Sequence, residues 1–151
     1  MNIQTVISAP IETCFELACN VDFHKSLDTN SERIIGGKTS GMLQIDDQIT
    51  WESTHFGIKQ KFVSKITALT SPTHLQDVMV EGAFKSYTHD HYFEKIDDIH
   101  TRMNDIIQYE VPMWAIGRLM EIGFMNKYLH NLIESRCNAI KEKAEQIARK
   151  Q

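Results

Sequence analysis

Residues 84–94, FKSYTHDHYFE, are the stretch on which the predicted fold and the predicted site both depend. We interpret it as a β-strand, in which side chains two residues apart point to the same face. Four of its side chains then share one face: Tyr87, His89, His91 and Phe93. Two imidazoles therefore lie among aromatic rings, and the function depends on whether this face meets solvent or an interior cavity.

The sequence around this stretch is a run of strands. Successive segments with strand character are separated by turn residues: residues 48–56, 58–69, 74–81, 84–95 and 100–110. Their close spacing favours consecutive antiparallel hairpins. Strict alternation fails near Gly82, where we expect a bulge or an irregular turn.

The register of the last two strands follows from the turn between them. A loop centred near Asp98 sets His91 opposite Asp105. The same register sets Tyr87 opposite Tyr109. In the last segment apolar and polar residues alternate, which marks the odd-numbered face as the inner one. A contact between a histidine and an aspartate on that face is therefore predicted.

The N-terminal part is expected to contain a first strand, at residues 2–8, and two short helices. Pro10 suits the first turn of a helix, because its missing N–H would have no partner there. Asn20 or Asp22 can cap the second helix. The glycines that follow are expected to separate two short strands: Gly36, Gly37 and Gly41.

Everything after Pro112 is expected to be helical. Two apolar stripes follow at helical spacing, and they differ in phase. The first contains Ile116, Leu119, Met120, Gly123 and Phe124. The second contains Leu129, Ile133, Cys137, Ile140, Ala144 and Ile147. The change of phase predicts a break at Gly123, with a short helix before a long C-terminal helix.

This order of elements predicts an α+β fold whose sheet buries one face against the last helix. Several segments also resemble the START/Bet v1-like (SRPBCC, polyketide cyclase/dehydrase-like) superfamily, in particular its small bacterial members: SAPIETCFELACNVDFH, TWESTHFGIKQKFVSKI, LQDVMVEGAFKSYTHDHYFEK and TRMNDIIQYEVP. The resemblance implies a helix-grip fold, in which a seven-stranded antiparallel curved sheet wraps around a long C-terminal helix and encloses an apolar cavity. Residues 1–151 would then form a single ligand-binding domain.

The resemblance does not select one activity, because the superfamily contains lipid carriers, hormone receptors, allergens and aromatase/cyclases. An apolar pocket with a few convergent polar groups is typical of a small-molecule site. The candidate ligand-binding residues are Trp51, His55, Phe62, Asp77, Met79, Tyr87, His89, His91, Met103, Asp105, Tyr109, Met120 and Phe124.

Several uses of this inner face stay open. The histidines and aspartates can satisfy one another in a plain interior. In the favoured hypothesis they orient the polar end of an apolar ligand, lipid-like or aromatic, beside an adaptable methionine wall. In a third, His55, His89 or His91 acts as general acid or base, held by Asp77 or Asp105, in a cyclase, dehydratase or isomerase without a cofactor. A protein–protein interaction module would instead expose a large apolar patch.

A metal site is the weaker interpretation of the same residues. His89 and His91 share a strand face, and Asp105 is a conceivable third ligand. A histidine pair also arises readily in a polar-lined cavity, so no metal is predicted. Arg136 lies at the edge of the long helix's apolar stripe, where we expect it to extend to solvent rather than meet an anionic ligand group.

The composition excludes several classes of partner. The 16 basic and 20 acidic residues give a net charge of −4 without a basic run, which disfavours nucleic acid. No apolar run approaches the roughly 18 residues of a membrane span, and the N-terminus lacks a signal core, so a cytoplasmic location without membrane insertion is expected. The 3 cysteines lack CxxC spacing, which is typical of reduced thiols. The oligomeric state is left open.

Overall fold

The computed structural model describes residues 1–28, 32–55, 58–112 and 119–150; within these ranges it leaves out the side chains of residues 55, 58, 119–122, 124 and 125. Seven antiparallel strands form one sheet in the order β1-β7-β6-β5-β4-β3-β2. The strands are β1 Asn2–Ile7, β2 Glu32–Gly37, β3 Gln48–His55, β4 Ile58–Thr70, β5 His74–Glu81, β6 Ser86–Lys95 and β7 Thr101–Glu110. The helices are α1 Ile11–Cys19, α2 Val21–Ser26 and α4 Leu119–Ala148.

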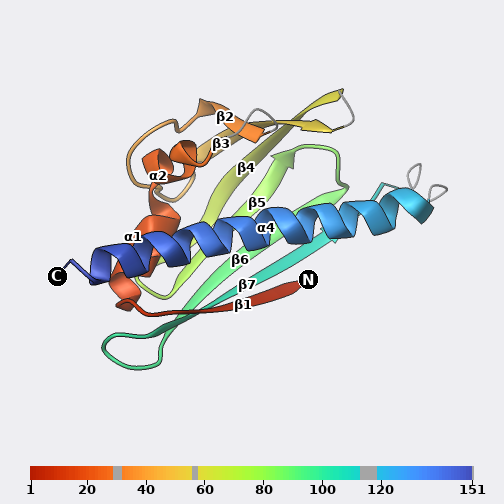
Figure 1. The fold of residues 1–151 in the computed structure, drawn as a ribbon. Coiled ribbons are helices and arrows are strands. Elements are labelled where there is room, and N and C mark those ends of the chain that lie inside the picture. Colours follow the sequence, from red (N-terminus) through yellow and green to blue (C-terminus); the bar gives the residue numbers. More distant parts are fainter. Residues whose placement is uncertain (29–31, 56–57, 113–118, 151) are drawn as a thin grey trace.

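Helix α4 lies across one face of the curved sheet, and α1 and α2 lie toward the C-terminal end of α4 (Figure 1). The predicted α+β helix-grip fold is therefore confirmed. No helix among the described residues is long and apolar enough to cross a membrane.

Local sequence accounts for the two short helices. Pro10 precedes α1, whose apolar residues Ile11, Phe15 and Ala18 are buried. The side chain of Asn20 caps α2 by accepting a hydrogen bond from the backbone N–H of Phe23 at 2.9 Å. Helix α1 contacts both α4 and β6, and Ala18 of α1 and His24 of α2 line an interior cavity.

The register of β6 and β7 agrees with the prediction. His91 pairs with Asp105, and Tyr87 pairs with Tyr109. Along β7 the odd-numbered residues from 101 to 107 are buried, while the even-numbered ones are more exposed. The predicted irregular turn near Gly82 is also present, since residues 82–85 lie between β5 and β6 outside both strands.

Two local predictions were wrong. The segment with three glycines forms one strand, β2, rather than two, because the chain turns at Gly37 and Gly41 with positive φ of 71° and 76°. Helix α4 also continues through Gly123 without a break. A helical glycine costs only about 1 kcal/mol relative to alanine, which the buried packing of this helix outweighs. The first residues of the predicted short helix, 113–118, lie outside the described residues.

The core lies between the sheet and α4. The predicted second stripe of the helix supplies it, since five of its members are buried: Leu129, Ile133, Cys137, Ile140 and Ala144. From the sheet, Ile7, Met103 and Ile107 are fully buried against them. Residues of β3 and β4, including Ile49, Trp51, Phe62 and Ile66, line a cavity beside this core.

Candidate functional site

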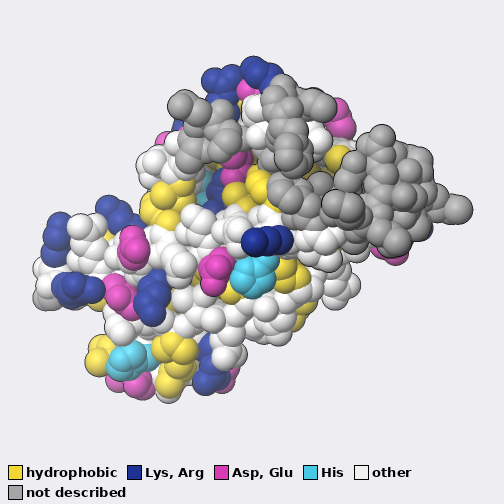
Figure 2. Space-filling model, turned by 45° about the vertical axis from the view of Figure 1, so that its right-hand side comes forward, with side chains coloured by type: hydrophobic (Ala, Val, Ile, Leu, Met, Phe, Trp, Pro, Cys, Tyr) yellow, Lys and Arg dark blue, Asp and Glu magenta, His cyan; other side chains and the backbone are white. Residues whose placement is uncertain are grey.

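A cavity of about 170 Å³ lies between the sheet and α4. A site for one water molecule needs roughly 10–15 Å³ by the same measure, so this space is not a packing defect. Its walls are mainly apolar: Ala18, Leu43, Ile49, Trp51, Phe62, Ile66, Leu75, Phe84, Tyr87, Leu129, Ile133 and Ile140. Hydrophobic side chains are visible beside charged ones in the upper middle of the molecule, next to the grey atoms (Figure 2).

Four polar residues from neighbouring strands lie side by side in the lining of this cavity. We call Asp77 of β5, His89 and His91 of β6, and Asp105 of β7 the polar patch. The sheet register brings them together, because Asp77 pairs with His89 and His91 pairs with Asp105. Their positions are therefore set by the backbone of the sheet rather than by loops.

Asp105 lies at the bottom of the polar patch, with 1% of its side chain exposed. Its Oδ1 lies 3.0 Å from His89 Nε2, in a hydrogen bond, and 2.7 Å from His91 Nδ1. The second contact is close, but Nδ1 has no hydrogen bond of good geometry, so it is a charge contact. The rings of His89 and His91 are 3.8 Å apart between centroids and tilted by 35°.

The two histidines differ in charge. Burial lowers the pKa of His89, and the neighbouring His91 lowers it further. Burial acts in the same direction on His91, but the Asp105 and Asp77 carboxylates outweigh it and raise the pKa of His91. Burial tends to raise the pKa of Asp105, but His91 and His89 hold it well below its usual range. With no other ion bound, Asp105 is a carboxylate, His91 an imidazolium and His89 a neutral imidazole.

Cys137 joins the same network from α4. Its thiol donates a hydrogen bond to Asp105 Oδ2 at 3.2 Å. Burial and the Asp105 charge both raise the pKa of this thiol, which favours its protonated form. Both oxygens of the Asp105 carboxylate thus have partners.

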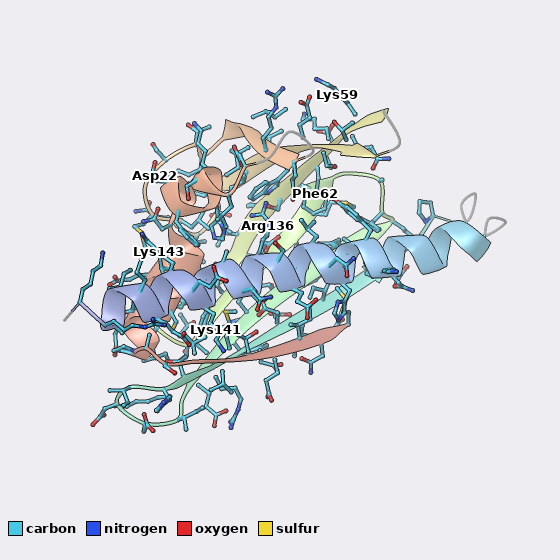
Figure 3. The ribbon with its side chains drawn as sticks, in the orientation of Figure 1. Asp22, Lys59, Phe62, Arg136, Lys141 and Lys143 are labelled. Atoms are coloured by element: carbon cyan, nitrogen blue, oxygen red, sulfur yellow. The ribbon has the colours of Figure 1, made fainter. Side chains whose placement is uncertain are left out.

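Arg136 reaches the cavity, contrary to the prediction that it extends to solvent. Its guanidinium lies 4.3 Å from the ring centroid of Trp51 and 3.3 Å from Glu32 Oε1. Figure 3 shows Arg136 on the side of α4 where Phe62 lies, whereas Lys141 lies on the other side of the helix. Helical spacing carried this signal, since Arg136 follows Ile133 by three positions and precedes Ile140 by four.

His24 of α2 completes the polar side of the cavity. Its Nε2 donates to the backbone oxygen of Ala18 at 2.8 Å, which leaves Nδ1 to face Arg136 Nη1 at 3.5 Å. Burial and the Arg136 charge lower the pKa of His24 to about 4. His24 and Arg136 are therefore functional candidates that sequence reasoning did not include among the site residues.

The structure places the predicted site residues in three groups. Those that line the cavity are Trp51, Phe62, Asp77, Tyr87, His89, His91 and Asp105. Those outside the described lining are Met79, Met103 and Tyr109. Met103 is fully buried in the core, and Tyr109 packs on Phe84 and hydrogen-bonds Asn126. The side chains of His55, Met120 and Phe124 lie outside the described part of the structure.

Comparison with known proteins gives likeness in structure alone. Neither the family models nor the curated protein sequences that were compared match this chain. A START superfamily protein from Mycobacterium smegmatis is 13% identical, with 97% of each chain covered and a TM-score of 0.69. A norcoclaurine synthase point mutant from Thalictrum, in complex with a transition state analogue, is 11% identical over 97% of this chain and 93% of that chain, with a TM-score of 0.71.

A third solved structure is the di-domain ARO/CYC StfQ from the steffimycin biosynthetic pathway. It is 9% identical over 97% of this chain and 44% of that chain, with a TM-score of 0.66. At these identities the likeness establishes the fold, and the function has to be argued from the site.

Proposed function

We propose that this chain, which has the fold of the START/Bet v1-like superfamily, binds an apolar small molecule with one polar end in the cavity beneath α4. Residues 1–151 act as one ligand-binding domain in this proposal. The observation that carries it is the lining of the 170 Å³ cavity, which combines apolar walls with the polar patch.

The apolar walls favour a lipid-like or aromatic body. Trp51, Phe62 and Tyr87 present aromatic surface, and Phe62 contacts Tyr87 edge to face with centroids 5.2 Å apart. Burial of ligand surface against such walls contributes about 25 cal/mol per Å² of apolar area. The apolar walls therefore select a ligand by its size and shape rather than by a particular chemical group.

The polar residues orient the ligand. Asp77, His89 and His91 line the cavity from the sheet, and Arg136 lines it from α4. A ligand oxygen placed between them replaces water as the hydrogen-bond partner of groups that are already largely desolvated. A wholly apolar ligand would offer no hydrogen-bond partner to the polar atoms that face the cavity, which disfavours it.

Acid–base conversion of a polyketide-like or carbonyl substrate by the polar patch stays a prediction. It requires that a bound molecule be changed, so product analysis distinguishes it from carriage. His89→Ala or His91→Ala would then abolish turnover and spare binding, and an unchanged rate would count against catalysis.

The binding proposal is tested by native mass spectrometry and by thermal shift screening with fatty acids and aromatic ketones. A ligand at about 100 times its Kd stabilises a protein by about 2.7 kcal/mol, which is readily detected. Ser53→Trp narrows the cavity because Ser53 lines it. Thr54→Trp is the matched control, since Thr54 is the next residue of β3 and is not part of the described lining.

We expect Ser53→Trp to lose the bound mass and the ligand-induced shift, and Thr54→Trp to keep both. The proposal is wrong if no compound binds to the wild-type protein, or if both variants bind as the wild type does.

A further inference from the structure

Two histidine nitrogens of the polar patch face one carboxylate oxygen. His91 Nε2 lies 3.7 Å and His89 Nδ1 lies 3.9 Å from Asp77 Oδ1. Both distances exceed those of hydrogen bonds. One donor atom from each residue lies within 4.8 Å of those of the other two. In a tetrahedral site with metal–ligand bonds of about 2.0–2.2 Å the ligand atoms are roughly 3.3 Å apart, so small side-chain rotations close the difference.

The opposite nitrogens of both rings face a second carboxylate. Asp105 Oδ1 lies 3.0 Å from His89 Nε2 and 2.7 Å from His91 Nδ1. In metal sites a histidine ligand characteristically gives its other ring N–H to a carboxylate, which fixes the tautomer and the ring orientation. Asp105 does this for His89 through a hydrogen bond, and it lies in charge contact with His91 Nδ1. Binding of an ion displaces the second proton of the His91 imidazolium, after which the lone pairs of His89 Nδ1 and His91 Nε2 both face Asp77.

Asp77 lacks the hydrogen bonds that a buried carboxylate normally has. Its side chain is 17% exposed, and in the described part of the chain it accepts no hydrogen bond within 3.5 Å. Its nearest described partners are the two histidine nitrogens at 3.7 and 3.9 Å. An ion bound between Asp77 and the two imidazoles would replace these long contacts with short metal–ligand bonds.

We propose that Asp77, His89 and His91 form a binding site for one divalent transition-metal ion, with Asp105 as the positioning residue behind the histidines. Two imidazoles and one carboxylate suit Zn²⁺ or Fe²⁺ better than Mg²⁺ or Ca²⁺, which prefer oxygen ligands. The three side chains all line the cavity, so a ligand in the cavity could reach an ion that they hold. This inference goes beyond ligand binding, because it assigns the polar patch an inorganic occupant.

Coordination positions that these three side chains do not fill give the ion a use in the cavity. A ligand oxygen or a water molecule would complete the coordination, as in catalytic zinc sites that keep one position free. This use rests on the proposed function, whereas metal binding itself does not. Metal binding is therefore tested without any organic ligand.

The test uses protein without an affinity tag, stripped with a chelator and then titrated with Zn²⁺ in a calorimeter. Co²⁺ serves as a second probe, because its visible absorption reports the coordination geometry. We expect one ion per chain. Asp77→Asn and His91→Asn should each weaken Zn²⁺ binding by at least tenfold, since even loss of a residue that only orients a ligand costs about 10- to 100-fold.

His74→Asn is the matched control. His74 Nε2 lies 2.8 Å from Asp90 Oδ1, so this is another histidine–aspartate pair on the same two strands, β5 and β6. It has no second histidine facing the same carboxylate among the described residues. We expect His74→Asn to bind Zn²⁺ as the wild type does.

The proposal is overturned if the wild-type protein binds no ion, or if Asp77→Asn and His91→Asn bind as tightly as His74→Asn. The latter result would assign the ion to surface histidines such as His100 or His130. Circular dichroism checks that each variant folds. If His91→Asn does not fold, the result for Asp77→Asn alone decides whether the proposal stands. Failure of metal binding would leave the mass spectrometry of organic ligands unaffected, so the two proposals can fail separately.

Discussion

His91 Nδ1 lies 2.7 Å from Asp105 Oδ1 where the two residues pair across β6 and β7, and the Asp105 side chain is only 1% exposed. A charge contact therefore lies between two inner strands of the sheet rather than on an edge strand. The backbone of two paired strands holds it, and α4 covers it through Cys137. This relationship determines both the chemistry and much of the stability of the polar patch.

Removal of the Asp105 charge should strongly destabilise the protein. Asp105→Asn leaves His91 in a buried site without its main counter-charge, and loss of one partner of a buried pair costs about 3–5 kcal/mol. Urea denaturation measures this change. Glu94→Gln is the matched control, because Glu94 pairs with Arg102 across the same two strands on the exposed face, 2.6 Å apart. We expect it to cost at most about 1 kcal/mol, and equal losses would contradict the argument.

The stability of the protein should fall on acidification through the titration of His24. The folded-state pKa of His24 is lowered to about 4, so between pH 6.5 and pH 4 the unfolded chain binds a proton that the folded chain does not. Stability is therefore full above this window and is lost as pH falls through it, by about 3 kcal/mol. Denaturation of wild type and His24→Gln at both pH values measures this, and a fall of the same size in the variant would refute it.

Arg136 should be one cause of the low pKa of His24. Arg136→Met keeps an apolar side chain over Trp51 but removes the charge that faces His24 Nδ1. We expect the pKa of His24 to rise, measured by NMR titration of its ring protons. Lys141→Met is the control, since Lys141 is on the same helix but points away from Arg136 (Figure 3). No rise in Arg136→Met would mean that the Arg136 charge does not lower the pKa, and an equal rise in both variants would mean that the effect is not specific to Arg136.

Gly37 should tolerate a side chain less well than Gly41. Both have positive φ, but a Cβ at Gly37 would overlap the backbone oxygen of Gln48, whereas a Cβ at Gly41 meets nothing within 4 Å. Gly41→Ala should lose about 1 kcal/mol of stability from backbone strain alone. Gly37→Ala should lose more, because the overlap adds to the same strain. The difference in unfolding free energy between the two variants is the measurement. A loss at Gly41 as large as at Gly37 would show that the overlap is relieved at no cost.

Sequence periodicity predicted the strand pairing well. The pairing of His91 with Asp105 followed from a turn near Asp98 and from alternation along β7, because a one-residue slip would turn every buried residue outward. The second stripe of α4 was predicted for a similar reason: burial of one face demands a helical period. These are local rules, and the local segments obey them.

The residues that line the cavity could not be predicted from local patterns. They depend on the distance between α4 and the sheet, which no local pattern specifies. Met103 has the same alternation as Asp105, yet it packs in the core while Asp105 lines the cavity. Arg136 was misjudged because a long cation at the edge of a stripe usually extends to water. Here Glu32 and Trp51 hold it instead, and both are distant in the sequence.

The cysteines give the molecule a built-in chemical probe. Cys14, Cys19 and Cys137 are all buried, and burial raises the pKa of Cys14 to about 11 and of Cys19 to about 12. Alkylating reagents attack thiolates, so none of the three should react while the core is closed. Cys137 is held further by its hydrogen bond to Asp105, on the face of α4 that packs on the sheet. The rate of maleimide labelling at Cys137 would therefore measure how often α4 separates from the sheet. The same motion would let a bulky ligand enter or leave the cavity.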